Sequence, residues 1–207
     1  MASVRSHKNI QLMTYSEVAD VSGYVGNFKV RIKQKPRYVD ITKCTGCGTC
    51  QDKCPMKADN EFDVGMGKRK AIYTPFPQAV PNVPVIDREH CTYFLKGKCR
   101  ACEKFCEAKA IDFEQAEKTV ELDVGNIIVT TGFDSFDPSV MQQFGYGRYD
   151  NVITGIQFER MSNASGPTSG KLVLKDGSPP QSVAILHCIG SRDVNYHQYC
   201  SRVCCMY

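Results

Sequence analysis

The cysteines are the residues of this sequence best suited to chemistry, because thiolates bind soft metals and take part in redox reactions. The chain of 207 residues contains 12 of them. Disulfides are rare in reducing compartments, so metal ligation or redox activity is the favoured interpretation. A cubane iron–sulfur cluster takes four thiolates. The cysteines fall into three groups of four: Cys44, Cys47, Cys50, Cys54; Cys91, Cys99, Cys102, Cys106; and Cys188, Cys200, Cys204, Cys205.

The first group has the spacing of a bacterial ferredoxin. The segment Cys44-x2-Cys47-x2-Cys50-x3-Cys54-Pro55 matches the run C-x2-C-x2-C-x3-C-P. In that run three thiolates bind one cubane and the fourth binds the other cubane of a two-cluster protein. Gly46 and Gly48 suit the tight loop, because glycine tolerates positive φ.

The second group repeats this spacing with an insertion between its first two cysteines, as Cys91-x7-Cys99-x2-Cys102-x3-Cys106. A short repeat, Val/Ile-Asp-x-x-x-Cys, ends at Cys44 and again at Cys91, so we assign Cys91 as a ligand. The crossed pattern then predicts two 4Fe–4S clusters. Cys44, Cys47, Cys50 and Cys106 are expected to hold one cluster, and Cys54, Cys91, Cys99 and Cys102 the other.

A zinc-binding interaction module is the alternative for these eight cysteines. Zinc favours two separated C-x2-C pairs for each ion. Here three cysteines lie between positions 44 and 50 and a fourth stands before a proline. The spacing therefore favours iron–sulfur clusters.

The last four cysteines have no ferredoxin spacing, being arranged as Cys188-x11-Cys200-x3-Cys204-Cys205. From the residues alone three interpretations stay open. They are a further cluster, a redox dithiol in a small flavin-dependent disulfide reductase, and buried structural thiols.

The elements that must position these cysteines follow from the apolar pattern, which predicts an α+β protein. Alternating runs from Ile10 to Lys33 predict two or three strands, and the segments TVELDV and NIIVTT after Thr119 predict more. Prolines between 75 and 84 indicate a loop. A helix is expected over about 151–163, and SVAILHCIG, a short apolar run between turn signals, is expected as a buried strand.

Composition excludes several classes of function. The net charge of +4 and the pI of 8.4 are too small for a nucleic-acid-binding footprint. No apolar run reaches the roughly 18–20 residues that a membrane span needs. The first 25 residues show no signal peptide. The expected location is the cytoplasm.

Several segments resemble the A-type subunit of heterodisulfide reductase. They are YSEVADVSGYVGNFKV, CTGCGTCQDKCP, KAIYTPFPQAVP, CRACEKFCEAKAIDF, NVITGIQFERMSNASGPT and CIGSRDVNYHQYCSRVCCMY, and they run through nearly the whole chain. The resemblance implies a two-cluster ferredoxin-like module inserted into part of an α/β, thioredoxin-reductase-like domain that binds FAD. The expected boundaries are 1–36 and 116–207 for the flavoprotein-like segments and 37–115 for the module.

The resemblance also implies site residues. It favours a third 4Fe–4S cluster on Cys188, Cys200, Cys204 and Cys205. It makes Thr131 and Gly132 candidate flavin neighbours, because VTTGFDSFDP looks like a flavoprotein strand and turn. The family's N-terminal G-x-G-x-x-G is absent from this chain. FAD is therefore expected only in the complete subunit, and the chain by itself is expected to be catalytically incomplete.

The activity that the resemblance implies is electron transfer. Family members pass electrons through 4Fe–4S clusters between FAD and partner subunits, and their complexes reduce a disulfide of two thiol coenzymes. The expected partners are other heterodisulfide-reductase-type iron–sulfur subunits and an electron-donor subunit of the hydrogenase or formate dehydrogenase type. The flavin of such complexes can also bifurcate electron pairs.

Overall fold

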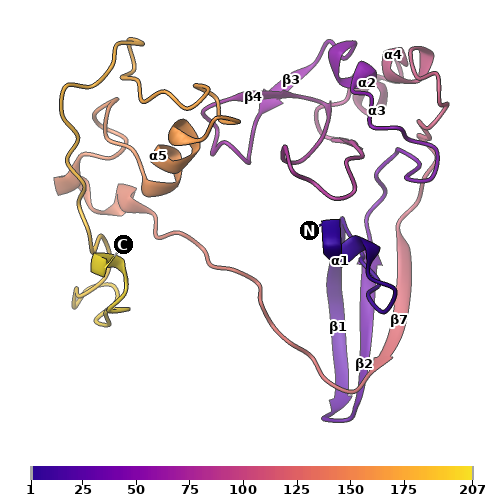
Figure 1. The fold of residues 1–207 in the computed structure, drawn as a ribbon, viewed down its shortest axis with the longest axis horizontal. Helices are drawn as coiled ribbons and strands as arrows, with labels where there is room; N and C mark the ends of the chain where they lie inside the picture. Colours follow the sequence, from indigo (N-terminus) through magenta and orange to yellow (C-terminus); the bar gives the residue numbers. More distant parts are fainter. Residues whose placement is uncertain (1, 207) are drawn as a thin grey trace. The chain divides into compact units, whose positions relative to one another are not determined.

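The computed structural model describes residues 2–206 and shows a mixed helix and strand protein (Figure 1). The chain divides into two compact units, residues 1–129 and 130–207. Helix α1 (Ala2–Ser6) begins the described part of the first unit. Over residues 2–206 no helix has the length and apolar composition that a bilayer crossing requires.

A three-stranded antiparallel sheet occupies one part of the first unit. Its order is β1 (Ser16–Tyr24), β2 (Asn27–Gln34) and β7 (Lys118–Val124). Val30 of the central strand pairs with Val21 and Leu122, so apolar side chains share one face of the sheet. The strands predicted between residues 10 and 33 and at TVELDV are confirmed. The chain leaves this sheet after β2 and returns to it as β7 (Figure 1).

The segment between β2 and β7 contains short elements around a separate core. Its hairpins pair β3 (Lys57–Asp59) with β4 (Lys68–Lys70) and β5 (Ile72–Tyr73) with β6 (Val85–Ile86). Its helices are α2 (Thr49–Asp52), α3 (Thr92–Lys96) and α4 (Ala101–Lys104). The core contains Val39, Ile72, Ile86 and Ala110, and cysteine side chains pack against it.

The sequence repeat ending at Cys44 and Cys91 corresponds to a repeated turn. The Asp40 N–H donates to the carbonyl of Ala110, and the Asp87 N–H donates to the carbonyl of Ala71, each at 2.7 Å. Each aspartate side chain also accepts the backbone N–H two residues later, at 2.8 Å and 2.9 Å. These turns are Asx turns. They end two core segments and direct the chain toward the first cysteine of each group.

The second unit contains one α-helix, α5 (Gly155–Ser162), within its described residues. Thr154 and Gln157 form a capping box that starts it. The helix predicted over 151–163 is confirmed, with its start set by this cap. Three 3-10 turns complete the unit: η1 (Pro138–Val140), η2 (Gln142–Phe144) and η3 (Cys204–Met206).

Two other predicted strands do not form. The segments NIIVTT and SVAILHCIG have no strand structure, and their side chains are largely exposed, with Ile128 at 87% and Ile185 at 69%. A strand exists only where a neighbour accepts and donates its backbone hydrogen bonds. No strand among residues 2–206 pairs with either segment, so the apolar pattern alone did not produce a buried strand.

Candidate metal centres

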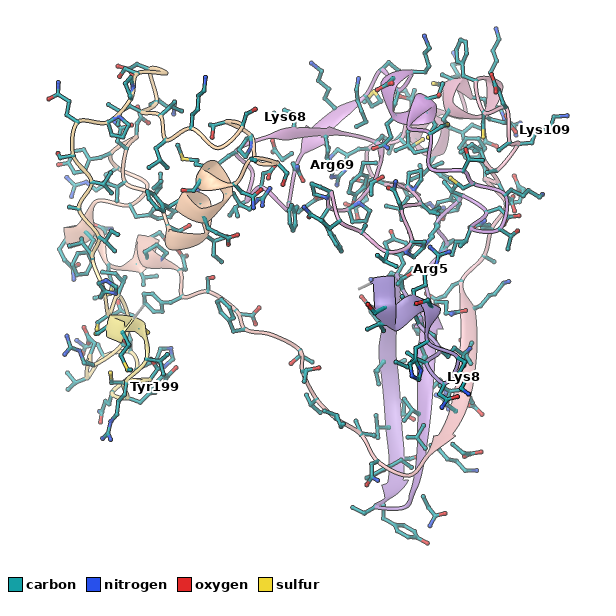
Figure 2. The ribbon with its side chains drawn as sticks, viewed as in Figure 1. Arg5, Lys8, Lys68, Arg69, Lys109 and Tyr199 are labelled. Carbon is teal, nitrogen blue, oxygen red and sulfur yellow. The ribbon has the colours of Figure 1, made fainter. Side chains whose placement is uncertain are left out.

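The first eight cysteines all lie in the segment between β2 and β7, and all are free thiols. Cys50 is part of α2 and Cys102 is part of α4, two helices that contact each other. In Figure 2 sulfur atoms appear beside these helices. Two short helices thus present cysteines from distant parts of the sequence to one region.

Three of these cysteines surround the buried thiol of Cys50. The pKa of Cys50 is raised to about 11, mainly by burial and in part by the neighbouring thiols of Cys44, Cys106 and Cys47. Like charges raise the pKa of a thiol only when they are close to it. The structure therefore brings Cys106 to the three cysteines of the first run.

The other four cysteines line one small cavity. Cys54, Cys91, Cys99 and Cys102 form part of its wall, and the remaining wall is largely apolar, from Pro55, Met56, Ala71, Ile72, Ile86 and Ala101. Burial raises the pKa of Cys102 to about 12, with Cys91 as the largest charged contribution and Cys50 and Cys54 as smaller ones. Cys54 thus faces the cysteines of the second group.

Glycines shape the loop that carries Cys47. Gly46 has φ of 72°, and a Cβ there would stand 2.9 Å from the carbonyl oxygen of Asn82. Gly48 has φ of 81° and precedes α2. Both positions need the left-handed backbone region that favours glycine, as the sequence predicted. The Gln51 side chain fixes α2 by hydrogen bonds with the backbone and hydroxyl of Thr74.

Backbone N–H groups donate to two of the sulfurs. Gly46 N–H donates to Cys44 Sγ at 3.4 Å, and Ala110 N–H donates to Cys106 Sγ at 3.3 Å. Such bonds stabilise negative charge on ligating sulfur and tune a cluster's potential. Both sulfurs belong to the Cys50 set.

The chemistry of these donors fits iron–sulfur ligation. A buried thiol with a raised pKa holds its proton until a metal replaces it. Burial and neighbouring thiols raise the pKa of Cys50 and of Cys102. No cationic side chain of residues 2–206 is among the main influences on these two pKa values. Bound iron would supply the positive charge that stabilises the thiolates. Among the same residues no group of three or more Cys, His, Asp or Glu side chains forms a single-ion site.

An ion-pair network that the sequence did not reveal supports the region. The side chain of Arg69 is 6% exposed, pairs with Glu61, and donates to Asp87 at 2.8 Å. Its guanidinium lies 3.8 Å from the ring centre of Tyr73. Burial raises the pKa of Asp87, but hydrogen bonds from Arg69 and His90 outweigh burial and hold it below its ordinary value. The sequence repeat singled out Asp87, but no pattern in the sequence indicated that Arg69 would pair with it.

The last four cysteines are not gathered in the same way. Cys188 is half-buried, and Cys200, Cys204 and Cys205 are exposed. Of the four, Cys200 lines an open depression of about 630 Å³ with Arg192, Tyr199 and Arg202 among its other walls. Arg202 N–H donates to Cys200 Sγ at 3.4 Å. A third cluster here stays a prediction.

The candidate flavin neighbours Thr131 and Gly132 lie in an exposed segment without helix or strand. Gly132 has φ of 79°, in the left-handed region that favours glycine. Their role also stays a prediction.

Comparison with known proteins identifies similar sequences. The family of the 4Fe–4S binding domain matches residues 37–58, which include the first cysteine run. Over its full length the chain is 51% identical to the A-type subunit of the H2:CoB–CoM heterodisulfide, ferredoxin reductase of Methanothermobacter thermautotrophicus, of which it covers 31%. It is 54% identical to an A-type iron–sulfur subunit of the CoB–CoM heterodisulfide reductase of Methanopyrus kandleri, again over 31% of that protein. A relative from Methanosarcina acetivorans, the A-type subunit of a ferredoxin/F420H2-dependent CoB–CoM heterodisulfide reductase, is 49% identical over 26% of its length. The chain thus spans about a third or less of these relatives.

Proposed function

We propose, on the premise that this chain is homologous over its whole length to part of the A-type subunit of CoB–CoM heterodisulfide reductase, that it is the iron–sulfur electron-transfer segment of such a protein. The observation that supports the proposal is the proximity of distant cysteines: Cys106 contributes to the raised pKa of Cys50, and Cys54 lines one cavity with Cys91, Cys99 and Cys102. We infer two sets of four, each with three cysteines from one part of the sequence and one from the other.

Two 4Fe–4S clusters are proposed for these sets. Cys44, Cys47, Cys50 and Cys106 would hold one, which we call cluster 1, and Cys54, Cys91, Cys99 and Cys102 would hold the other, which we call cluster 2. The clusters, when bound, supply one-electron redox chemistry. The residues of the chain hold the sulfurs, exclude water from the Cys102 side and donate hydrogen bonds to the Cys44 and Cys106 sulfurs.

The boundaries of the iron–sulfur module are proposed as residues 37–115, inserted between flavoprotein-like segments 1–36 and 116–207. The pairing of β2 with β7 supports the insertion, since the module leaves and rejoins one sheet. A third cluster on Cys188, Cys200, Cys204 and Cys205, and flavin contacts from Thr131 and Gly132 in the complete subunit, complete the proposal.

The complete protein is proposed to work with other subunits in the cytoplasm. Names of relatives mention H2, formate, F420H2 and ferredoxin beside the heterodisulfide. We propose that electrons from a hydrogenase-type or formate-dehydrogenase-type subunit reach FAD. From FAD the clusters would pass them toward partner iron–sulfur subunits that reduce a disulfide.

Iron and EPR measurements on the Cys54→Ser variant test the crossed ligand sets. The chain should be purified anaerobically, and its iron, sulfide and zinc quantified. Cys54→Ser should remove or convert cluster 2 and leave the EPR signal of cluster 1, although Cys54 belongs to the first run. Cys50→Ser is the matched control and should affect cluster 1. Loss of the same signal in both variants would show that the ligand sets are not crossed, and a colourless chain containing zinc would reject iron–sulfur ligation.

A further inference from the structure

Each proposed cluster has one solvent-exposed cysteine, and the two differ in their surroundings. Cys47 is the exposed cysteine of cluster 1 and Cys99 is that of cluster 2. An electron that leaves for another protein leaves most readily where a ligand reaches the surface, because electron transfer weakens steeply with separation. The charges around these two cysteines therefore indicate where a carrier can dock.

Basic residues flank Cys99 in the sequence. Residues 95–104, which we call the Cys99 surface, contain four exposed basic side chains and one acidic side chain, Glu103. Glu103 is paired with Arg100, whose guanidinium donates to it at 2.8 Å. Over residues 2–206 no carboxylate lies within ion-pair distance of the other three basic residues, which are Lys96, Lys98 and Lys104.

The loop at Cys47 lacks this excess of positive charge. Its neighbours Thr45 and Thr49 are uncharged, and the Cys47 thiol donates to the Thr49 hydroxyl at 3.5 Å. The nearest cation before it in sequence, Lys43, is paired with Asp40 at 3.6 Å. A charged partner thus has little to recognise beside Cys47.

The Cys99 surface also offers an apolar contact. Leu95 at the end of α3 is 57% exposed. Transient electron-transfer interfaces are small and combine a few apolar contacts with a charged rim. Three unpaired lysines steer an acidic protein toward such a contact and raise the rate of encounter.

We propose that the Cys99 surface is the docking site for an acidic protein that carries one electron, and that electrons leave the module through cluster 2. This inference rests on the proposed function. In each transfer the reduced cluster loses one electron and is oxidised, and the carrier gains that electron and is reduced. No bond is made or broken between the two proteins.

Stopped-flow reduction of an acidic flavodoxin tests the proposal. The full chain, with its clusters reduced by dithionite and excess reductant removed, is mixed with oxidised flavodoxin. One electron and one proton from water give the blue semiquinone, which absorbs apart from the clusters. The double variant Lys96→Glu/Lys98→Glu should lower the second-order rate constant about tenfold or more at low ionic strength. Added salt should slow the wild-type reaction and have little effect on the variant.

The matched control is Lys29→Glu/Lys118→Glu, which changes the net charge equally at exposed lysines of β2 and β7. Its rate constant should stay within about twofold of the wild type, because these lysines belong to β2 and β7 and not to residues 95–104. Equal slowing by both double variants, or by neither, would overturn the docking site.

Carbodiimide cross-linking gives a readout that does not depend on electron transfer. It joins carboxylates of the bound flavodoxin to nearby lysines, and mass spectrometry should find the links at Lys96, Lys98 or Lys104. Links found mainly elsewhere would contradict the proposal. Iron content distinguishes failure of the proposed function from failure of the docking site. A chain without iron rejects the proposed function. An iron-loaded chain whose rate constant does not change when these lysines are replaced rejects the docking site alone.

Discussion

At the scale of the residue, ionising the buried thiols of the proposed centres is unfavourable in the metal-free chain, and metal ligation offsets that cost. Burial and neighbouring thiols raise the pKa of Cys50 to about 11 and of Cys102 to about 12. At neutral pH these groups are thiols, and metal ligation requires the thiolate. Iron must displace their protons, so cluster assembly is coupled to proton release.

Iron uptake by the cluster-free chain is therefore expected to depend on pH. Since Cys102 keeps its proton up to a pKa of about 12, the apparent iron affinity should continue to rise above about pH 8.5, the ordinary pKa of cysteine. Anaerobic competition with a coloured chelator over a pH series measures this. The Cys50→Ser/Cys102→Ser variant should lack most of the rise above that pH. A wild-type affinity that levels off near the ordinary cysteine pKa would contradict the prediction.

At the scale of the element, the proposed centres are supported by short hairpins and turns and not by long helices or strands. None of β3, β4, β5 and β6 exceeds three residues. Such short hairpins are marginal by themselves. Side-chain contacts between them must supply the stability, and the Arg69 network is the main polar contact of this kind. It links β4 to the turn that precedes Cys91.

Replacing Arg69 tests this support. Arg69→Met leaves Glu61 and the largely buried Asp87 without their cation, and the free energy of unfolding should fall by about 3 kcal/mol. Lys68→Met is the matched control. Lys68 and Arg69 are neighbours on β4 (Figure 2), but the side chain of Lys68 is 65% exposed and pairs with Asp59 at the surface. The control should lose about 0–1 kcal/mol.

Anaerobic urea unfolding followed by circular dichroism measures both variants. A similar loss of unfolding free energy in Arg69→Met and Lys68→Met would show that burial of the Arg69 guanidinium does not determine its contribution to stability.

At the scale of the whole molecule, the first eight cysteines and their supporting core lie in one of the two compact units. That unit comprises residues 1–129, and it contains the three-stranded sheet and the cysteine-lined core. The last four cysteines lie in the other unit, residues 130–207. The two proposed clusters therefore need no residue from the second unit.

A chain that ends at Val129 is expected to keep both clusters. It should bind about eight iron atoms, since each cubane contains four, and it should show the same EPR signals as the full chain. A third cluster in the second unit would add about four iron atoms to the full chain alone. Loss of iron from the shortened chain, with its circular dichroism unchanged, would show that the second unit contributes to the centres.

The sequence by itself determined the chemistry of the protein. The spacing from Cys44 to Pro55 indicates iron–sulfur ligation because it is the run of a bacterial ferredoxin, and the match of residues 37–58 to the 4Fe–4S binding domain agrees with it. Local signals also located β1, β2 and β7 by alternation, and α5 by the Thr154 cap, because these features depend on neighbours along the chain.

The tertiary structure decided what depends on distant partners. It brought Cys106 to Cys50 and Cys54 to Cys102, and it paired buried Arg69 with Asp87. It left the apolar segments at Ile128 and Ile185 exposed and unpaired over residues 2–206, where periodicity predicted strands. A strand, an ion pair and a shared ligand set each require a second segment, and the position of that segment is fixed by packing and not by local pattern.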